Sequence, residues 1–122
     1  MIIIKFLKSF TFAIAGIAYA FRSQVNMRFH VFAALMVVIS AIFFHISPME
    51  WCIILLCIGS VLSAELINTS IEINVDLSTS ERNKNAGYAK DLAAAAVLVI
   101  CLISAIIGSI VFIPKIIHFI SA

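Results

Sequence analysis

Four polar side chains stand at helical spacing within an otherwise apolar stretch of the chain. They are Glu65, Asn68, Glu72 and Asp76, which follow one another at intervals of three, four and four residues. At about 100° per residue, this spacing places them on one stripe of a helix about 80° wide. The three carboxylates of this acidic stripe repel one another, so the stripe needs a proton, a cation or a Lys or Arg partner. Hard divalent ions such as Mg²⁺ are bound by carboxylates of this kind.

Glu65 is the strongest functional candidate of the acidic stripe, because it lies deepest in the apolar run. An ionised group is costly within a membrane, and such a residue marks a functional site by default. Asp76, near the end of the run, is equally explained by contact with water or a neighbouring helix. Lys90 is the nearest cation that could balance the stripe. A simpler alternative is that Lys90 reaches the headgroups, while Asp91 stabilises the positive end of the helix that follows.

A second polar pattern precedes the first long apolar segment. Polar residues occupy every second position and are expected to mark a bend between two helices: Arg22, Gln24, Asn26, Arg28 and His30. His30 is expected to be a hydrogen-bonded histidine at the membrane interface and not a ligand. His45 and His118 are assigned no role.

The composition excludes a soluble monomer. Hydrophobic residues make up 64% of the 122 residues and charged residues 11%, against roughly 45–50% and about 25% in globular proteins. A small domain buries only about two thirds of its chain surface, too little to hide so many apolar side chains. The formal net charge of +2 is too small to indicate nucleic-acid binding. The cysteines show no metal-binding spacing, and no phosphate-binding loop or nucleophile elbow is present. An all-α integral membrane protein is therefore expected.

Three segments are apolar and long enough to cross about 30 Å of hydrocarbon, which takes roughly 20 residues. They are 29–46, 49–71 and 92–113, and each must be helical because lipid offers the backbone no hydrogen-bond partner. Ser47-Pro48-Met49-Glu50 has the pattern of a capping box, so the first two spans are predicted to form a tight hairpin. The small residues 93–96 predict close helix packing, and residues 77–88 are predicted to form the only real loop.

The basic residues orient these spans. Seven of the eight Lys and Arg residues fall on one side, which is expected to be cytoplasmic, with the N-terminus inside, the C-terminus outside and Trp51 at the outer interface. Residues 1–28 leave two alternatives open. The 13 residues between Lys8 and Arg22 reach about 20 Å as a helix, too short to cross, which favours an amphipathic helix in the interface. The lysines, a short apolar core and Ala18-Tyr19-Ala20 also fit a secretory signal.

At these residues the chain resembles the small bacterial membrane-embedded lipid kinases, the diacylglycerol kinase and undecaprenol kinase family. The most specific matching strings are AELINTSIE at 64–72, VDL at 75–77 and AKDLAAAAVL at 89–98. Weaker matches are Gly16 with residues 19–20, residues 26–30, Glu50-Trp51 and residues 113–115. The resemblance covers nearly the whole chain. It implies a homotrimer in the bacterial plasma membrane, with active sites shared between subunits near the cytoplasmic interface, and with residues 1–28 kept as an amphipathic surface helix.

The resemblance also implies a reaction, the ATP- and Mg²⁺-dependent phosphorylation of a lipid hydroxyl. Glu65 matches the general base, and Glu72 matches a carboxylate that holds the metal on the nucleotide. Asn68 and Asp76 match polar residues that support the site. Phosphoryl transfer depends mainly on positioning and on neutralising charge. A carboxylate in an apolar setting is also well suited to accept a hydroxyl proton.

The remaining matches concern the nucleotide. Lys90 matches the lysine on the phosphates, and Asp91 matches its companion. Lys5 and Glu81 stand where family members contact the nucleotide. The family usually has a second metal-binding glutamate at the position of Gln24, which offers an oxygen without charge, so weaker metal binding is expected.

Three further points stay open at this stage. The family often has a histidine at the position of Asn83, in the loop that contacts the nucleotide. The substrate is either undecaprenol, which residues 26–30 and 113–115 favour, or diacylglycerol. The competing class of protein is a non-enzymatic transporter or channel subunit that uses Glu65 as a proton or cation site. Lys90-Asp91 and the loop at 78–88 favour the kinase, because a transporter would not need them.

Overall fold

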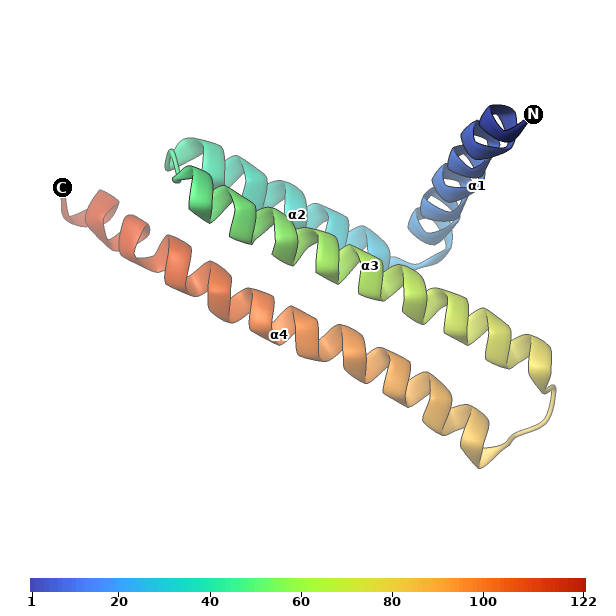
Figure 1. Cartoon of the computed structure of the whole chain (residues 1–122). Coiled ribbons are helices and arrows are strands. Elements are labelled where there is room, and N and C mark those ends of the chain that lie inside the picture. The colour runs from blue at the N-terminus through green and yellow to red at the C-terminus, as the bar shows by residue number, and fades with distance from the viewer.

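The computed structural model describes all residues, 1–122, as four helices joined by short connections. The helices are α1 (Ile2–Ser23), α2 (Val25–Phe43), α3 (Pro48–Ser78) and α4 (Lys84–Ser121). α2, α3 and α4 run side by side and alternate in direction, whereas α1 leaves this bundle at a steep angle (Figure 1). The N-terminus and the α3–α4 connection lie toward one end of the molecule, and the α2–α3 turn and the C-terminus lie at the other. The predicted all-α fold is confirmed.

All four helices are long and apolar enough to cross a membrane by length and composition. For α1 this differs from the prediction, which counted only the residues between Lys8 and Arg22. The helix is continuous from Ile2 to Ser23 and takes in apolar residues before Lys5, which makes it about 33 Å long at 1.5 Å per residue. α1 is also the most amphipathic of the four helices.

The predicted bend lies at Gln24, whose backbone is extended with φ −112° and ψ 118°. Ala20 precedes this bend and Met27 follows it, and both side chains are buried. α1 contacts α2 and α3, but it does not contact α4. The bend therefore allows the end of α1 and the beginning of α2 to pack together against α3.

The capping box at the start of α3 is confirmed. The Glu50 amide donates to Ser47 Oγ at 3.2 Å, the Ser47 amide donates to Glu50 Oε1 at 3.0 Å, and Pro48 occupies the first turn. Two backbone donors that a helix start leaves unpaired are thus satisfied, so the turn between α2 and α3 can be short. Glu50 also forms an ion pair with Lys115 of α4, whose Nζ lies 3.1 Å from Glu50 Oε2.

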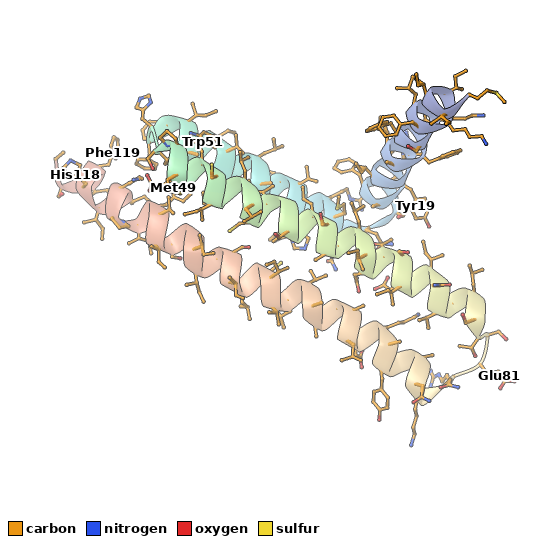
Figure 2. The ribbon with its side chains drawn as sticks, viewed as in Figure 1. Tyr19, Met49, Trp51, Glu81, His118 and Phe119 are labelled. Atoms are coloured by element: carbon orange, nitrogen blue, oxygen red, sulfur yellow. The ribbon has the colours of Figure 1, made fainter.

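The apolar core lies at the same end of the bundle as this turn. Its buried side chains come from α2, the turn, α3 and α4: Ala41, Ile46, Ile54 and Val111. Aromatic rings from the end of α2 and from α4 pack edge to face nearby, with Phe43 and Phe119 centroids 5.5 Å apart. Trp51 packs against the core, and Figure 2 shows it at the opposite end of the molecule from Glu81.

The connection between α3 and α4 is shorter than the predicted loop at 77–88, because it comprises residues 79–83 alone. α4 begins early because Asn83 caps it, with its Oδ1 accepting from the Asn85 amide at 2.8 Å and from the Ala86 amide at 3.4 Å. Ala93 is buried, and α3 and α4 form the most extensive helix pair. Of the small residues at 93–96, only Ala93 is buried, so the predicted close packing is confirmed for that residue alone.

Most of the apolar surface of the single chain is uncovered. Only 11 of 122 residues are buried, and large apolar side chains are exposed along every helix. A soluble monomer does not expose apolar surface on this scale. Lipid tails or neighbouring membrane helices would cover this apolar surface. The length of the helices is consistent with the same membrane environment.

Candidate active site

The acidic stripe lies on α3 and runs from the interior of the bundle to its surface. Glu65 and Asn68 are buried, Glu72 is half-buried and Asp76 is exposed. The order follows the chain, so the environment of the stripe changes from apolar to aqueous toward the α3–α4 connection. A lipid could therefore approach the buried end and a water-soluble substrate the exposed end.

Glu65 is the largest residue with less than 2% of its surface exposed. It forms an ion-pair contact with His30 of α2, whose Nε2 lies 3.8 Å from Glu65 Oε2. This distance exceeds that of a hydrogen bond, and the carboxylate makes none within the chain. The main-chain carbonyl of Glu65 accepts from Thr69 Oγ1 at 2.9 Å.

His30 is thus a functional candidate for which the sequence predicted no functional role. Its place among alternating polar residues suggested a role at the interface, whereas the structure directs its ring toward the deepest carboxylate. The available signal was its position within the string at 26–30, which belongs to the weaker part of the resemblance.

Asn68 and Glu72 form the middle of the stripe. Asn68 Nδ2 donates to Glu72 Oε1 at 3.3 Å, which leaves Asn68 Oδ1 buried with no hydrogen-bond partner. A buried polar atom without a partner is costly and requires an explanation. An unpaired amide oxygen beside a carboxylate is a donor set suited to Mg²⁺, which prefers oxygen ligands and usually takes the rest from phosphates and water. No group of three or more His, Cys, Asp or Glu residues could hold a metal alone, so any ion here needs such outside ligands.

Asp76 and Lys90 join the stripe to α4. Lys90 Nζ lies 2.5 Å from Asp76 Oδ1, so the expected cationic partner of the stripe is present. The hydrogen bond that Lys90 donates to Asp76 raises the pKa of Lys90 above its usual value, and the ammonium stays charged at neutral pH. Asp91 is exposed and lies seven residues inside α4, which begins at Lys84. The alternative that Asp91 stabilises the positive end of that helix is therefore wrong, because Asn83 holds the capping position.

Three sequence-predicted site residues stand apart from these contacts. Lys5 and Glu81 are exposed, Gln24 is half-buried, and none of their side chains forms a hydrogen bond or ion pair. Figure 2 shows Glu81 at the α3–α4 connection, at the end of the molecule where the stripe reaches the surface. A nucleotide would have to bridge these residues to the stripe, because they do not contact it directly.

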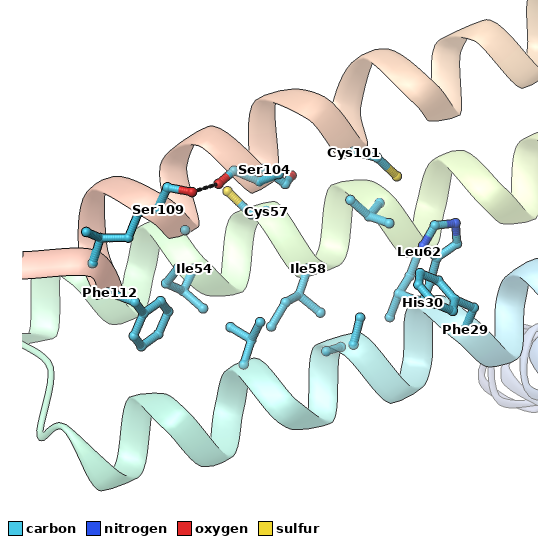
Figure 3. A pocket seen from close by; sticks show the side chains of 17 residues that line it. Phe29, His30, Ile54, Cys57, Ile58, Leu62, Cys101, Ser104, Ser109 and Phe112 are labelled. Carbon is cyan, nitrogen blue, oxygen red and sulfur yellow. Dashed lines mark hydrogen bonds between the residues drawn. The ribbon is translucent and has the colours of Figure 1, made fainter. Parts of the chain in front are cut away.

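An apolar cavity of about 540 Å³ adjoins the buried end of the stripe. It lies between α2, α3 and α4, and 13 of its 17 lining residues are hydrophobic. Figure 3 shows His30 and Phe29 from α2, Leu62 from α3 and Cys101 from α4 around one end of it. From there the cavity extends toward Phe112, near the aromatic cluster at the opposite end of the bundle.

Comparison with known proteins shows which family this chain resembles. Residues 11–112 match the prokaryotic diacylglycerol kinase family. The undecaprenol kinase of Bacillus subtilis is 46% identical over 111 residues, which cover 91% of this chain and 90% of that protein. A diacylglycerol kinase of a Synechocystis species is 36% identical over 109 residues, covering 88% of this chain and 62% of that longer protein. The diacylglycerol kinase of Haemophilus influenzae is 26% identical over 107 residues, covering 87% and 91%.

The matched residues include the whole acidic stripe, Gln24, His30, Glu81, Lys90 and Asp91, whereas Lys5 lies before them. The helices required of a multi-pass membrane protein are present. The prediction of a lipid kinase is thus confirmed, and the transporter or channel subunit is set aside. On the family match and the 46% identity over nine tenths of its length, the chain belongs to the prokaryotic diacylglycerol kinase family and is a membrane lipid kinase.

Proposed function

We propose that this lipid kinase transfers the γ-phosphate of ATP, with Mg²⁺, to the hydroxyl of undecaprenol, and that diacylglycerol is the second candidate substrate. The observation that carries the reaction is the order of the stripe, from buried Glu65 through Asn68 and Glu72 to the Asp76–Lys90 pair. The choice of undecaprenol rests on the higher identity to a kinase of that name than to two diacylglycerol kinases. The product would feed lipid carrier recycling, or phospholipid metabolism if diacylglycerol is the substrate.

The length of α3 supports this arrangement. Its 31 residues make a helix about 46 Å long, whereas the hydrocarbon is about 30 Å thick. Measured from Trp51 at the outer interface, the hydrocarbon would end near Ile71, about 20 residues along. Glu65 then lies about 9 Å inside the inner boundary, and Asp76 lies about 7.5 Å outside it. A lipid hydroxyl reaches Glu65 while its tail remains in the bilayer, and ATP reaches Lys90 from water.

The chemistry divides among these residues. Glu65 accepts the proton of the lipid hydroxyl as its oxygen attacks the γ-phosphorus. The new oxygen–phosphorus bond forms as the bond to the β–γ bridging oxygen breaks, so ADP leaves with that electron pair. Lys90 offsets charge on the phosphates, and Asp76 holds its ammonium in place at 2.5 Å. The apolar cavity beside His30 can take the part of the lipid next to its hydroxyl.

Glu72 and Asn68 would hold Mg²⁺ on the nucleotide, because they offer a carboxylate and an unpaired amide oxygen. The ion, when bound, supplies charge neutralisation on the phosphates. Gln24 is proposed as a weaker oxygen ligand from the bend between α1 and α2. Asp91, Lys5 and Glu81 are proposed as nucleotide contacts on the same side of the membrane.

The remaining proposals concern assembly. The spans are residues 29–46, 49–71 and 92–113 of one lipid kinase domain, and α1 lies in the cytoplasmic interface. The marked amphipathicity of α1, its steep angle to the bundle and the buried Ala20 at its end support this over the other alternative, a cleaved secretory signal. The exposed apolar surface of α2, α3 and α4 supports a homotrimer, as the family resemblance implies.

Phosphate transfer from labelled ATP to purified lipids tests the proposed substrate. The purified protein, in detergent micelles that contain undecaprenol, diacylglycerol or no lipid, is expected to label undecaprenol with the higher kcat/KM. Labelled diacylglycerol with no labelled undecaprenol would make diacylglycerol the substrate. No labelled lipid in either micelle would overturn the proposed reaction.

The topology of the chain gives a separate prediction. Single cysteines are introduced at Lys84 or Lys115 in a variant that lacks the three native cysteines. They are expected to react from opposite sides of the membrane. The reason is the Lys and Arg asymmetry, which predicts residues 77–90 inside and the C-terminal tail outside. Labelling with an impermeant maleimide in intact cells and in inverted vesicles measures this. Labelling of both positions from the same side would contradict three spans.

A further inference from the structure

We propose that His30 is a positioning residue that acts through Glu65. His30 receives the substrate proton from Glu65 and passes that proton to water. This inference rests on the proposed role of Glu65 as general base. The observation that carries it is the juxtaposition of an imidazole and an almost fully buried carboxylate, with His30 Nε2 3.8 Å from Glu65 Oε2. The two side chains come from α2 and α3, so the helix packing itself brings them together.

The burial of Glu65 creates the need for such a partner. Its side chain is 2% exposed, whereas that of His30 is 15% exposed. A carboxyl group that has taken the hydroxyl proton at this depth has little direct contact with water, and it must lose the proton before the next turnover. A histidine is suited to this step because one ring nitrogen can accept a proton while the other releases one.

The surroundings offer no comparable alternative. The other titratable groups that face Glu65 are Glu72 on the same helix and Cys101 on α4. Glu72 is engaged by Asn68 and is proposed to hold the metal, and a thiol is a poor acceptor for a carboxylic acid proton. Lys90 already carries its proton in the hydrogen bond with Asp76. His30 therefore offers the ring nitrogen that can accept a proton from Glu65.

The proton path is balanced in the following way. The lipid hydroxyl proton moves to Glu65 Oε2 as the oxygen–phosphorus bond forms, and Glu65 then gives it to His30 Nε2. The imidazolium releases one proton to water, which restores a neutral ring and an ionised Glu65. The 3.8 Å separation has to shorten for the second transfer, in keeping with catalytic hydrogen bonds that tighten only when substrate is bound.

Chemical rescue tests the inference, because His30 lines the cavity of about 540 Å³ and its removal enlarges that space. His30→Ala is expected to lower kcat about 10- to 100-fold, at or below the lower end of the range for direct acid–base catalysis, and to leave the KM for ATP unchanged. Added imidazole should restore part of the lost kcat. Pyrazole, a ring of the same shape and far weaker basicity, should not restore kcat.

His118→Ala is the matched control, because His118 is an exposed histidine of α4 at the other end of the bundle. This variant should behave as wild type.

The outcomes separate this inference from the proposed function. Wild-type kcat in His30→Ala, equal rescue by pyrazole and imidazole, or no rescue of a folded variant would each overturn the role of His30. In Glu65→Gln/His30→Ala, imidazole should have no effect, because the base that it serves is absent. Full turnover in Glu65→Gln alone would instead overturn the general base on which this inference rests, whereas only the absence of labelled lipid with the wild-type protein would overturn the proposed reaction. If His30→Ala does not fold, His30→Gln replaces it, and unchanged kcat in that variant would overturn the proton transfer.

Discussion

Glu65→Gln is expected to lower the kinase turnover by about 10²- to 10⁴-fold, the range typical of losing a general base. Glutamine keeps the shape of the side chain and removes its ability to take a proton. Folding should be retained, since the substitution removes a potential charge from a site that is 1% exposed. ATP binding should be retained as well, because Glu65 is not among the proposed nucleotide contacts. The measurement is kcat with labelled ATP and undecaprenol, together with equilibrium ATP binding and thermal unfolding in the same detergent.

Glu50→Gln is a suitable control for this prediction. Glu50 is a second glutamate of α3 at the opposite end of the bundle, and glutamine can still complete a capping box. It is expected to keep wild-type turnover, although it loses the ion pair with Lys115. If Glu65→Gln retained most of its turnover, Glu65 would be a packing residue and the proposed mechanism would be wrong.

Glu72→Gln is expected either to abolish activity or to raise the Mg²⁺ concentration for half-maximal activity by more than about tenfold. It would leave only amide oxygens at positions 24, 68 and 72, and charge on the ligands tunes the affinity for hard divalent ions. Gln24→Glu should act in the opposite direction and lower that concentration several-fold. A magnesium titration of kcat at saturating ATP and lipid measures both effects.

Asn74→Asp is the matched control for the added charge. Asn74 is exposed on α3 and does not belong to the acidic stripe, so a carboxylate there adds the same local charge without a metal ligand. Its titration should match wild type. If Gln24→Glu leaves the titration unmoved while Glu72→Gln shifts it, Gln24 has no metal role. If neither variant moves it, the assignment of the metal to this stripe is wrong.

The order of polar residues along α3 could be predicted because it depends on a single helix. Helical geometry alone places residues at spacings of three and four on one face, and the structure shows Glu65, Asn68 and Glu72 there with decreasing burial. The capping box of Ser47 and Glu50 was equally readable, because its two hydrogen bonds join residues only three apart. The extent of the α3–α4 connection was not, because turn-forming residues such as Ser78 and Asn83 also occur as the last residue and the cap of helices.

The contacts between helices depended on tertiary structure. Nothing in the spacing of residues joins His30 to Glu65, 35 positions apart, because the register of α2 against α3 is set by the turn at 44–47 and by packing around Ala41 and Ile54. Lys90 could be named as the nearest cation, but only the packing of α4 on α3 directs it to Asp76 and not to Glu72. The unpaired oxygen of Asn68 likewise becomes visible only when the hydrogen bond to Glu72 has used the other side of the amide.

By itself the sequence determined that this protein is helical, that it lies in a membrane, and that carboxylates stand on one face of its longest apolar run before Lys90. Composition and period are local quantities, and lipid leaves the backbone little choice but a helix. The tertiary structure decided which of these groups meet: Glu65 with His30, Asn68 with Glu72, and Asp76 with Lys90. Side-chain contacts across helices depend on their relative rotation and translation, which arise from the summed packing of many apolar residues and cannot be read from any single segment.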